Sequence, residues 1–173
     1  DNLPVLIPEV DKILSEVCED YEIVIIEDHS PDKTGEAADQ LALQYPKVRV
    51  VHHETNRYYG GALISGFAAA SLDWVFYTDG DAQYDVGELA LLTKKVSDKI
   101  DIVQGYKIKR HDPWYRIVIG NIYNFGVKLA FGIKIRDVDC DFRLIRRSVF
   151  DKVRLTHQSG VITVEMVKKI QEA

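Results

Sequence analysis

The sequence predicts an α/β protein whose mostly parallel sheet is flanked by helices. Short runs of apolar, often β-branched residues alternate with stretches of helical spacing from the start of the chain to about residue 107. Such alternation is typical of strand–helix–strand units, in which helices cover a parallel sheet. The chain has 173 residues, of which 46% are hydrophobic, so one domain with a sizeable core can form.

The first half of the chain contains two predicted helices and two predicted strands. Apolar residues recur at helical spacing over residues 3–17, which predicts an opening helix. The run YEIVIIE at 21–27 is continuous and rich in β-branched residues, as expected of a strand covered on both faces. A helix is predicted over 36–44 and a second strand over 48–53.

The second half continues the alternation. ALISGFAAA at 62–70 predicts a short helix of small residues, and WVFYTD at 74–79 a third strand. Another helix is predicted over 86–96 and a fourth strand over 101–107. After these come an amphipathic stretch at 114–131, the segment DVDCDFRLIRR at 137–147, and a last helix from about residue 161.

Composition and charge limit the class of function. The formal net charge is −5 and no long basic run occurs, which argues against nucleic acid as the main partner because phosphate backbones require a positive surface. Cys18 and Cys140 are the only cysteines and form no CxxC motif, which favours a reducing, cytoplasmic location. The sequence contains no signal peptide and no uncharged apolar run of about 18 residues.

The most specific site pattern is WVFYTDGDAQYD at 74–85, where a buried strand ends in two carboxylates one residue apart. Asp79 and Asp81 can surround one cation if the chain turns between them, and Gly80 permits a tight turn. Hard divalent cations prefer carboxylate oxygens, and Mg²⁺ usually keeps waters and substrate phosphates as ligands. Gln83 can add a carbonyl oxygen. The alternative is an ordinary Asp/Gly turn.

A second cluster is expected at the same edge, because ligands of open α/β sheets bind outside the carboxyl ends of the strands. Asp28 ends the first predicted strand and should face the same crevice as Asp79; a helix N-cap or turn residue is the equally weighted alternative. The loop NRYYGGALISGF at 56–67 places glycines before a helix, as phosphate-binding loops do. It matches neither GxGxxG nor the P-loop pattern, and close helix–sheet packing explains Gly60 and Gly61 equally well.

Basic residues gather after residue 106. Arginine forks suit bidentate phosphate binding, although most surface arginines are merely solvated. The five histidines are scattered, and no Ser/His/Asp or Cys/His nucleophile pattern stands out. The basic residues concerned are Lys107, Lys109, Arg110, Arg116, Arg143, Arg146 and Arg147.

Five motifs, taken in order, resemble the inverting, GT-A-fold glycosyltransferases of family two. They are EIVIIEDHSPDKT, NRYYGGALISGF, YTDGDAQ, DIVQGYKIKR and RDVDCDFRLIRR. The resemblance covers nearly the whole chain and is greatest to the enzymes that make dolichyl-phosphate mannose and bacterial polyprenyl-phosphate sugars. It implies a GT-A (Rossmann-like) sheet. It also implies transfer of a sugar from a nucleotide-diphosphate sugar, GDP-mannose or a UDP-sugar, to a polyprenyl phosphate with inversion at C1.

The resemblance implies where the donor nucleotide binds. Asp28 matches the acid that contacts the base or ribose, and Asn56 and Gly60 belong to the family's Asn-x-Gly-x-Gly-Gly-Ala loop. His29 and Tyr58 stand where the family usually has glycine. The backbone geometry at Tyr58 is therefore an open question.

The resemblance also implies the metal and acceptor residues. Asp79, Asp81 and Gln83 match the family's Asp-x-Asp-x-Gln, which implies a divalent cation, Mg²⁺ or Mn²⁺, on the donor diphosphate, so Asp79 belongs to the donor site as well. The cation stabilises the charge left on the diphosphate as the sugar departs. Arg116 and Arg143 match arginines assigned to the acceptor phosphate. Catalysis is assigned to Asp79, Asp81 and Arg143.

Three other functions remain as alternatives. A phosphate acceptor is already anionic and attacks C1 without a strong base, whereas a sugar hydroxyl, in polysaccharide or glycan synthesis, would need one. Asp139 or Asp141 would then serve, and Asp141 stands where the family has glycine. A catalytically silent nucleotide-binding module is an alternative of another class. A nucleotidyltransferase also uses paired acids, but the sequence shows no glycine-rich activation loop near its start.

The chain is expected to be a fragment, residues 1–173 of a single glycosyltransferase catalytic domain truncated at both ends. The family's first strand, which ends in Pro-x-Tyr-Asn-Glu, does not precede DNLPVLIPEV here. An inner strand would then lose a neighbour, and unpaired backbone groups at such an edge attract another chain or further residues. A homo-oligomer is left open.

The 114–131 stretch carries Trp114, Ile122 and Phe125 at mostly helical spacing. Polar residues interrupt it, so it suits the surface of a bilayer better than its interior. A helix at the bilayer interface would bring Arg116 close to a lipid phosphate, and a helix packed on the sheet is the alternative. The predicted location is peripheral to, or anchored at, the cytoplasmic face of a membrane.

Overall fold

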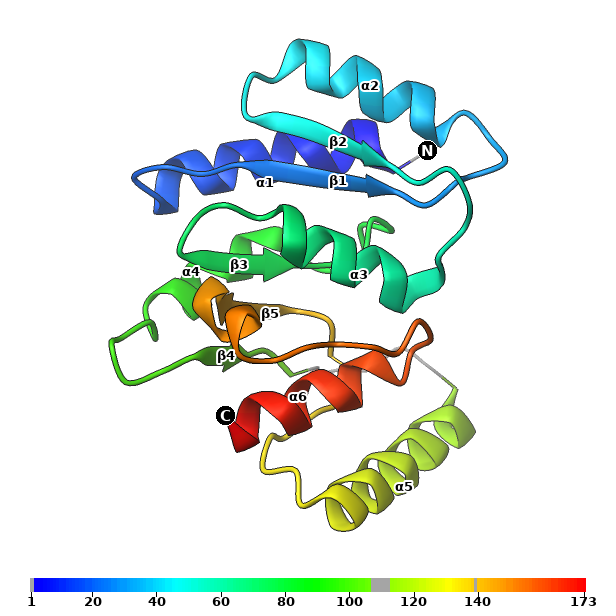
Figure 1. Ribbon diagram of the computed structural model, residues 1–173, viewed down its shortest axis with the longest axis vertical. Helices are drawn as coiled ribbons and strands as arrows, with labels where there is room; N and C mark the ends of the chain where they lie inside the picture. Colours follow the sequence, from blue (N-terminus) through cyan, green and yellow to red (C-terminus); the bar gives the residue numbers. More distant parts are fainter. Residues whose placement is uncertain (1, 107–112, 139) are drawn as a thin grey trace.

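The computed structural model describes residues 2–106, 113–138 and 140–173 (Figure 1), with the side chain of Arg116 left outside the description. Helices and strands alternate as far as the fourth strand. The elements are α1 (Leu3–Val17), β1 (Ile23–Glu27), α2 (Thr34–Gln44), β2 (Val48–His52), α3 (Tyr58–Ala69), β3 (Trp74–Tyr77), η1 (Val86–Glu88), α4 (Leu89–Thr93), β4 (Ile102–Gln104), α5 (Trp114–Phe131), β5 (Arg143–Arg146), η2 (Arg147–Asp151) and α6 (Ile162–Glu172).

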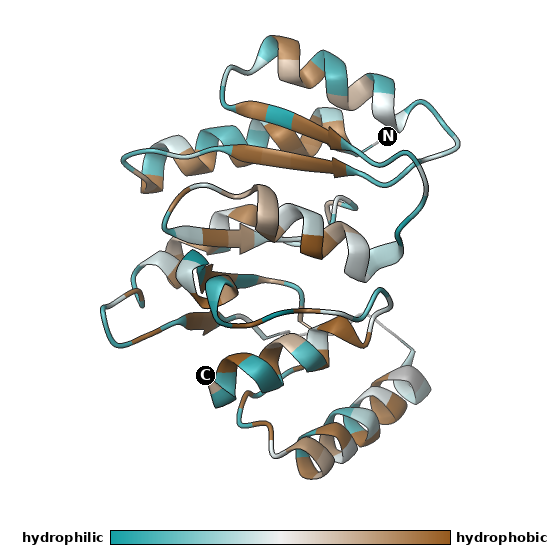
Figure 2. Ribbon diagram, in the orientation of Figure 1, coloured by the Kyte–Doolittle hydropathy of each residue, from teal (hydrophilic) through white to brown (hydrophobic). Residues whose placement is uncertain are grey.

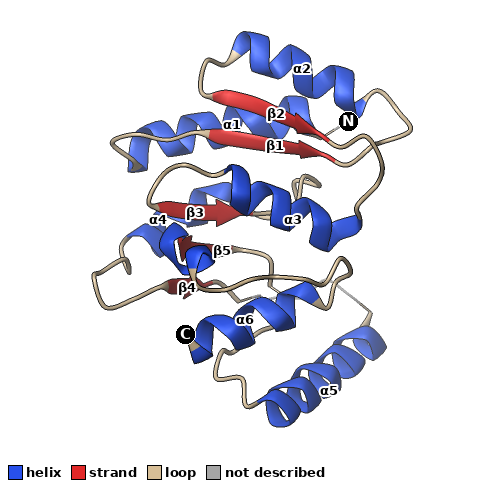
Figure 3. Ribbon diagram, viewed as in Figure 1, coloured by secondary structure: helices blue, strands red, loops and turns tan. Residues whose placement is uncertain are grey.

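The strands of the described residues form two sheets, with helices around them (Figure 3). β1 and β2 pair in parallel, from Ile23 opposite Val48 to Glu27 opposite His52. β5 lies between β3 and β4 and runs antiparallel to both. The predicted α/β fold, with a parallel sheet and flanking helices, is confirmed. The antiparallel pairs come from β5, whose segment the sequence pattern had left unassigned.

The sheet is interrupted between β1 and β3. Within the described part of the chain, β1 pairs only with β2 and β3 pairs only with β5. The two strands start beside each other, because the backbone N–H of Ser71, ahead of β3, donates to the Glu22 carboxylate, ahead of β1, at 2.6 Å. In Figure 1 their arrowheads point the same way. The facing edges of β1 and β3 are therefore not paired with each other among the described residues.

Apolar side chains from helices and strands build the core around both sheets. Leu6 and Ile7 of α1 pack with Ile25 of β1 and with α2 in one cluster. A second cluster joins α3 to β3 and β5, where the rings of Phe67 and Tyr77 meet edge to face with centroids 5.5 Å apart. These contacts hold α3 across the interrupted part of the sheet.

Helix α5 has the predicted bounds and an unusually apolar surface. Pro113 precedes it, and Gly132 ends it in the left-handed conformation with φ of 63°, as is common at helix ends. Ile122, Phe125 and Leu129 are 66%, 69% and 75% exposed. Figure 2 shows hydrophobic residues recurring along this helix. None of the helices in the described ranges is both long and apolar enough to cross a bilayer.

Several boundaries differ from the sequence prediction. β3 ends at Tyr77, so Asp79 belongs to the loop that follows. α3 begins at Tyr58 rather than at residue 62, because the glycines that suggested a loop lie within the helix. The helix predicted over 86–96 is a 3₁₀ turn followed by the short α4. β4 ends at Gln104, and the predicted end at residue 107 falls outside the described residues.

Candidate active site

The predicted acids gather where β1 and β3 end. Asp28 follows β1 directly, and Asp79 lies two residues after β3. The start of α1 also reaches this edge, since the side-chain amide of Asn2 donates to the backbone carbonyl of Asp81 at 3.1 Å. The start of α1 and the loop after β3 therefore meet although they lie far apart in the sequence; a crevice shared by Asp28 and Asp79 stays a prediction.

The loop after β3 is a sequence of short turns. Asp81 Oδ1 accepts the backbone N–H of Gln83 at 3.0 Å, and Ala82 between them has a left-handed φ of 58°. Asp85 caps the following turn by accepting the N–H of Gly87 at 2.9 Å. Asp81 and Gln83 are exposed while Asp79 is half-buried. Asp85 thus has a structural role, and Asp81 shapes the turn to Gln83.

The negative charge of Asp79 acts on three nearby tyrosines. Burial, followed by neighbouring charges that include Asp79 and Asp141, raises the pKa of Tyr59 and of Tyr84. The pKa of Tyr77 is also raised, by burial first and then by the same two acids, against an opposing effect of the nearby Arg143. Asp141 therefore belongs to the same neighbourhood as Asp79.

The donor atoms at this site suit a hard divalent cation. Two carboxylates one residue apart, with a neighbouring amide, offer oxygen ligands. Burial is the main cause of the raised pKa of Tyr59 and of Tyr84, and the negative charges of Asp79 and Asp141 add to it. No group of three or more His, Cys, Asp or Glu side chains in the described ranges could hold a metal by itself. Asp79, Asp81 and Gln83 as metal ligands stay a prediction.

Arg143 is fully buried, with no exposed surface. Its Nε donates to Gln104 Oε1 and one terminal nitrogen donates to Tyr77 Oη, both at 2.6 Å, while the other donates to the carbonyl of Val138. The guanidinium therefore holds β3, β4 and the loop before β5 together. A direct contact of Arg143 with the acceptor phosphate stays a prediction, and this buried geometry does not favour it.

Gln104 completes this buried network. Its amide nitrogen donates to the carbonyls of Asp137 and Cys140 at 3.0 and 2.9 Å, while its oxygen accepts from Arg143. Tyr84 fixes the same loop from the other side, because its Oη accepts the N–H of Asp141 at 3.2 Å. The sequence pattern gave no signal for Gln104 or Tyr84, since their partners lie more than 30 residues away.

Asp28 links the ends of β1 and β2. Its Oδ1 accepts the backbone N–H of Arg57 at 2.7 Å and lies 2.6 Å from Nδ1 of His53. The other ring nitrogen of His53 is 2.8 Å from Ser65 Oγ on α3. Asp28 thus fixes the loop after β2, a structural role other than the helix cap or local turn given as its alternative. Its predicted contact with the nucleotide stays a prediction.

The glycine loop starts α3. Asn56 Oδ1 accepts the N–H of Tyr58 at 2.8 Å, and Tyr58 has a left-handed φ of 60°. This settles the open question at Tyr58, because the backbone keeps the conformation that glycine favours. Gly60 donates its N–H to the carbonyl of Gln158 at 2.7 Å, and a β-carbon there would collide with the backbone of His157. Packing is therefore one demonstrated role of Gly60.

Glu165 of α6 holds the segment that touches Gly60. Its carboxylate accepts the N–H groups of Thr156 and His157 and the ammonium of Lys169. Burial opposes ionisation, yet these hydrogen bonds hold the pKa of Glu165 well below its ordinary value. Glu165 therefore supports the site indirectly, and its sequence position in a helical pattern gave no sign of this.

Five residues named from the sequence fall wholly or partly outside the described residues, among them Lys107, Lys109 and Arg110. Arg116 lies on the first turn of α5, but its side chain is outside the described residues, as are Asp139 and the stretch 107–112. Their predicted roles stay predictions.

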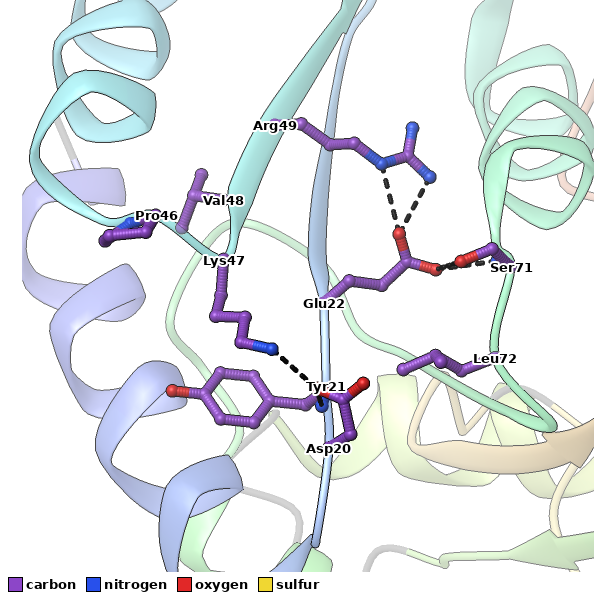
Figure 4. Close-up of a pocket in the computed structure, with 9 residues that line it drawn as sticks. All are labelled: Asp20, Tyr21, Glu22, Pro46, Lys47, Val48, Arg49, Ser71 and Leu72. Carbon is purple, nitrogen blue, oxygen red and sulfur yellow. Dashed lines mark hydrogen bonds and ion pairs between the residues drawn. The ribbon is translucent and has the colours of Figure 1, made fainter.

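A cavity of about 260 Å³ lies at the opposite end of β1 and β2 (Figure 4). Its charged groups pair with one another. Arg49 donates to Glu22 at 3.0 and 3.1 Å, and Lys47 pairs with Asp20. Despite burial, hydrogen bonds from Ser71 and Arg49 lower the pKa of Glu22. The polar groups of this cavity stabilise the fold, so it is not assigned a ligand.

Comparison with known proteins gives an independent view of the chain. The sequence model of the family described as Glycosyl transferase family 2 matches residues 4–154. A polyprenol monophosphomannose synthase of Mycolicibacterium smegmatis is 29% identical over 170 residues, covering 90% of this chain and 61% of that protein. An undecaprenyl-phosphate 4-deoxy-4-formamido-L-arabinose transferase of Serratia proteamaculans is 28% identical over 160 residues, covering 91% and 49%.

A protein of the same name from Aeromonas hydrophila subsp. hydrophila is 30% identical over 153 residues, covering 87% of this chain and 46% of that relative. The chain thus spans between about half and three-fifths of the length of these relatives. Because the family match covers most of the sequence and agrees with the observed fold, this chain belongs to glycosyl transferase family 2.

Proposed function

We propose that this chain is the catalytic part of an enzyme that transfers a sugar from a nucleotide-diphosphate sugar to a polyprenyl phosphate, with inversion at C1. The observation that carries this is the Asp79–Asp81 loop at the carboxyl end of β3 in a chain of this family. The names of the relatives support the acceptor, because they specify polyprenol monophosphate and undecaprenyl phosphate products or substrates. GDP-mannose and UDP-sugars are the donors considered.

Asp79, Asp81 and Gln83 would hold a divalent cation, Mg²⁺ or Mn²⁺. When bound, such an ion supplies Lewis-acid stabilisation to the departing diphosphate. The chain's own contribution is to fix the carboxylates: the Asp81–Gln83 turn and the Asn2 contact hold the loop in place. Arg143 fixes the end of β3 through Tyr77 and the loop before β5 through Val138. We therefore assign Arg143 a positioning role.

The donor nucleotide is proposed to lie along the loops after β1 and β2. Asp28 and Asn56 shape those loops through their bonds to Arg57 and Tyr58. Gly60 keeps the start of α3 close to the 157–158 backbone. Main-chain N–H groups at the start of a helix suit a phosphate, since they carry partial positive charge.

The acceptor is proposed to arrive from a membrane surface along α5. Its exposed apolar face, with Trp114 at 77% exposure, suits the interface of a bilayer. Arg116 on the first turn of this helix would bind the lipid phosphate. The anionic phosphate oxygen then attacks C1 without help from a strong base. The proposal therefore includes a location at the cytoplasmic face of a membrane, as a peripheral or anchored enzyme.

A labelling assay tests the proposal. Full-length protein is incubated with radiolabelled GDP-mannose or UDP-sugars, Mg²⁺ or Mn²⁺, and polyprenyl phosphate, and the lipid phase is extracted. We expect labelled lipid with one of these donors. Label in a water-soluble glycan would support the second candidate, a hydroxyl acceptor, which Asp141 beside Asp79 could serve as base. Donor binding without transfer to any acceptor would indicate a silent nucleotide-binding module.

A further inference from the structure

Two polar atoms near Asp79 are buried without a hydrogen-bond partner among the described residues. They are Oη of Tyr59, on the first turn of α3, and Oδ1 of Asp141, two residues before β5. Buried polar groups are nearly always paired, because an unpaired one costs folding free energy. Two such atoms close together therefore indicate that a bound ligand group forms hydrogen bonds with both.

The two side chains lie close together. Burial first, and then the nearby Asp141, Tyr77 and Asp79, raise the pKa of the Tyr59 phenol. The Asp141 carboxylate also acts on the Tyr59 phenol as a weak hydrogen-bond acceptor, but the geometry falls short of a full hydrogen bond, since neither Tyr59 Oη nor Asp141 Oδ1 has a partner within hydrogen-bonding geometry in the described part of the chain. The separation is held by backbone contacts, because the N–H of Asp141 donates to Tyr84 Oη and the N–H of Gly60 donates to Gln158.

The chemistry of the pair defines the ligand group. A phenol can donate one hydrogen bond, and an ionised carboxylate only accepts. A hydroxyl group can do both at once: it accepts from Tyr59 and donates to Asp141. A phosphate oxygen would satisfy Tyr59 but be repelled by Asp141, and a cation would leave the phenolic hydrogen without an acceptor. A sugar hydroxyl is therefore the fitting group.

We propose that Tyr59 and Asp141 together bind one hydroxyl group of the sugar carried by the nucleotide diphosphate, and so orient and select that sugar beside Asp79. The inference rests on the proposed function, because it requires a nucleotide-sugar donor.

Calorimetry with full-length protein and Mn²⁺ tests the pair. GDP and UDP, and then the corresponding GDP-mannose, UDP-glucose and UDP-N-acetylglucosamine, are titrated into wild type, Tyr59→Phe and Asp141→Ala. We expect unchanged affinity for the nucleoside diphosphate in both variants. For the preferred nucleotide sugar we expect a loss of about 3- to 10-fold in Tyr59→Phe and about 10- to 100-fold in Asp141→Ala, as for a neutral and a charged hydrogen bond.

A set of monodeoxy donor sugars identifies the hydroxyl. Wild type should bind one deoxy sugar donor more weakly than the natural donor, because the hydroxyl that the pair binds is missing. Each variant has already lost that contact, so it should bind the deoxy donor and the natural donor with equal affinity. Asp98→Asn is the control on an exposed side chain, and it should bind the sugar donors like wild type.

Thermal unfolding without ligand separates a binding role from a structural one. Because neither atom has a protein partner among the described residues, Tyr59→Phe and Asp141→Ala should leave the unfolding midpoint unchanged or raise it. A lowered midpoint together with weaker binding of both GDP or UDP and the sugar donor would overturn the inference in favour of a structural role.

The remaining outcomes are distinct. Unchanged sugar-donor affinity in both variants, with nucleoside diphosphate binding intact, overturns the inference and leaves the proposed function standing. A reduced kcat of Asp141→Ala with unchanged donor affinity would assign Asp141 to acceptor activation and overturn it likewise. Wild type that binds neither nucleoside diphosphates nor nucleotide sugars overturns the proposed function, and this inference with it.

Discussion

At the scale of single residues, the site keeps left-handed backbone conformations without glycine. His29, Tyr58 and Ala82 have φ of 59°, 60° and 58°; His29 and Ala82 lie in the loops after β1 and β3, and Tyr58 is the first residue of α3. Such a conformation costs a residue with a β-carbon about 1–2 kcal/mol. Backbone strain of this kind is found at functional sites, where surrounding contacts impose it. Here the Asn56 side chain holds Tyr58 in place.

Replacement of Tyr58 by glycine should therefore stabilise the fold. The Tyr58 side chain is 66% exposed, so little packing is lost. Relief of strain exceeds the extra entropy of a glycine in the unfolded chain, and we expect a gain of about 0.5–1 kcal/mol in the free energy of unfolding. Urea denaturation measures it. Tyr58→Phe is the control and should change nothing; a glycine variant less stable than wild type would contradict the strain.

The metal prediction also belongs to this scale. Asp79→Asn or Asp81→Asn should weaken Mn²⁺-dependent binding of a nucleoside diphosphate at least about 10-fold, because an amide is a poorer ligand for a hard cation. The fold should persist, since both side chains lie in the loop after β3. Titration calorimetry with and without Mn²⁺ measures the effect, with Asp98→Asn as the exposed control. If both variants bind the nucleoside diphosphate with the same Mn²⁺-dependent affinity as wild type, Asp79 and Asp81 are not metal ligands.

Single residues show where sequence reasoning stops. Asp79 and Asp28 could be placed at one edge because both follow apolar runs that predict strands. His53 could not be linked to Asp28, because the contact joins residues 25 apart in a loop whose path depends on the whole fold. Arg143 is predicted from the sequence to bind the acceptor phosphate, and only the structure shows that Gln104, Tyr77 and Val138 bind it inside the protein.

At the scale of elements, buried carboxylates connect loops to helices. Glu165 on α6 binds the segment 156–157, which in turn touches the first turn of α3 at Gly60. Neither the strand β5 nor this tie was predicted. The strand RLIR is short and contains two arginines, so its pattern favours no strand by itself. The segment becomes a strand because it pairs with β3 on one side and with β4 on the other.

The Glu165 tie should make the fold sensitive to acid. Its folded pKa lies below that of the unfolded chain, so its stabilising effect is complete at neutral pH. The effect declines below about pH 4.3, the ordinary pKa of a glutamate, as pH falls towards the folded pKa. Glu165→Gln should lower stability at pH 7, and the difference from wild type should shrink below about pH 4.

Urea unfolding at a series of pH values from neutral to acid follows that difference. Glu172→Gln on the same helix is the matched control, because its pair with Lys168 is at the surface and surface pairs contribute little. A Glu165→Gln protein whose deficit is constant over the whole pH range would show that the carboxylate's charge is not the cause.

Helix α5 should bind bilayers through its exposed face. Ile122, Phe125 and Leu129 changed together to Ser remove apolar surface that is exposed in this structure and should reduce liposome binding of the full-length protein about 10-fold or more. Flotation with polyprenyl-phosphate-containing vesicles measures binding. The control changes Val5, Leu43 and Leu91, which are also exposed and lie on other helices, to Ser. Equal loss in both triple variants would exclude α5 as a specific membrane contact.

At the scale of the whole molecule, the break between the two sheets is the main departure from a continuous α/β sheet. The α/β class could be predicted because strand and helix patterns alternate over most of the chain. The break follows from strand neighbours, which periodicity within single segments does not specify. α3 and the Glu22–Ser71 bond hold the two halves across it. The site loops of Asp28 and Asp79 thus sit on strands that are not paired with each other.

Amide hydrogen exchange tests what this break does to the 173-residue chain. In a parallel pair, successive residues direct their N–H groups to opposite sides. Ile23 donates towards β2, to the carbonyl of Lys47 at 2.8 Å, so Ile25 and Glu27 face β2 as well, and Val24 and Ile26 face the break. We expect fast exchange at Val24 and Ile26 and slow exchange at Ile25, because unpaired edge amides open to solvent.

The 173-residue chain and the full-length protein are compared under the same conditions, and sedimentation at several concentrations reports whether the chain self-associates. If a second copy or a further strand pairs with β1, Val24 and Ile26 should become protected, with a matching rise in mass only in the first case. Equal protection of Val24, Ile25 and Ile26 in a monomeric 173-residue chain that unfolds cooperatively would contradict an open edge at β1. The break would then be closed within the chain itself, and the loops of Asp28 and Asp79 would share one continuous support.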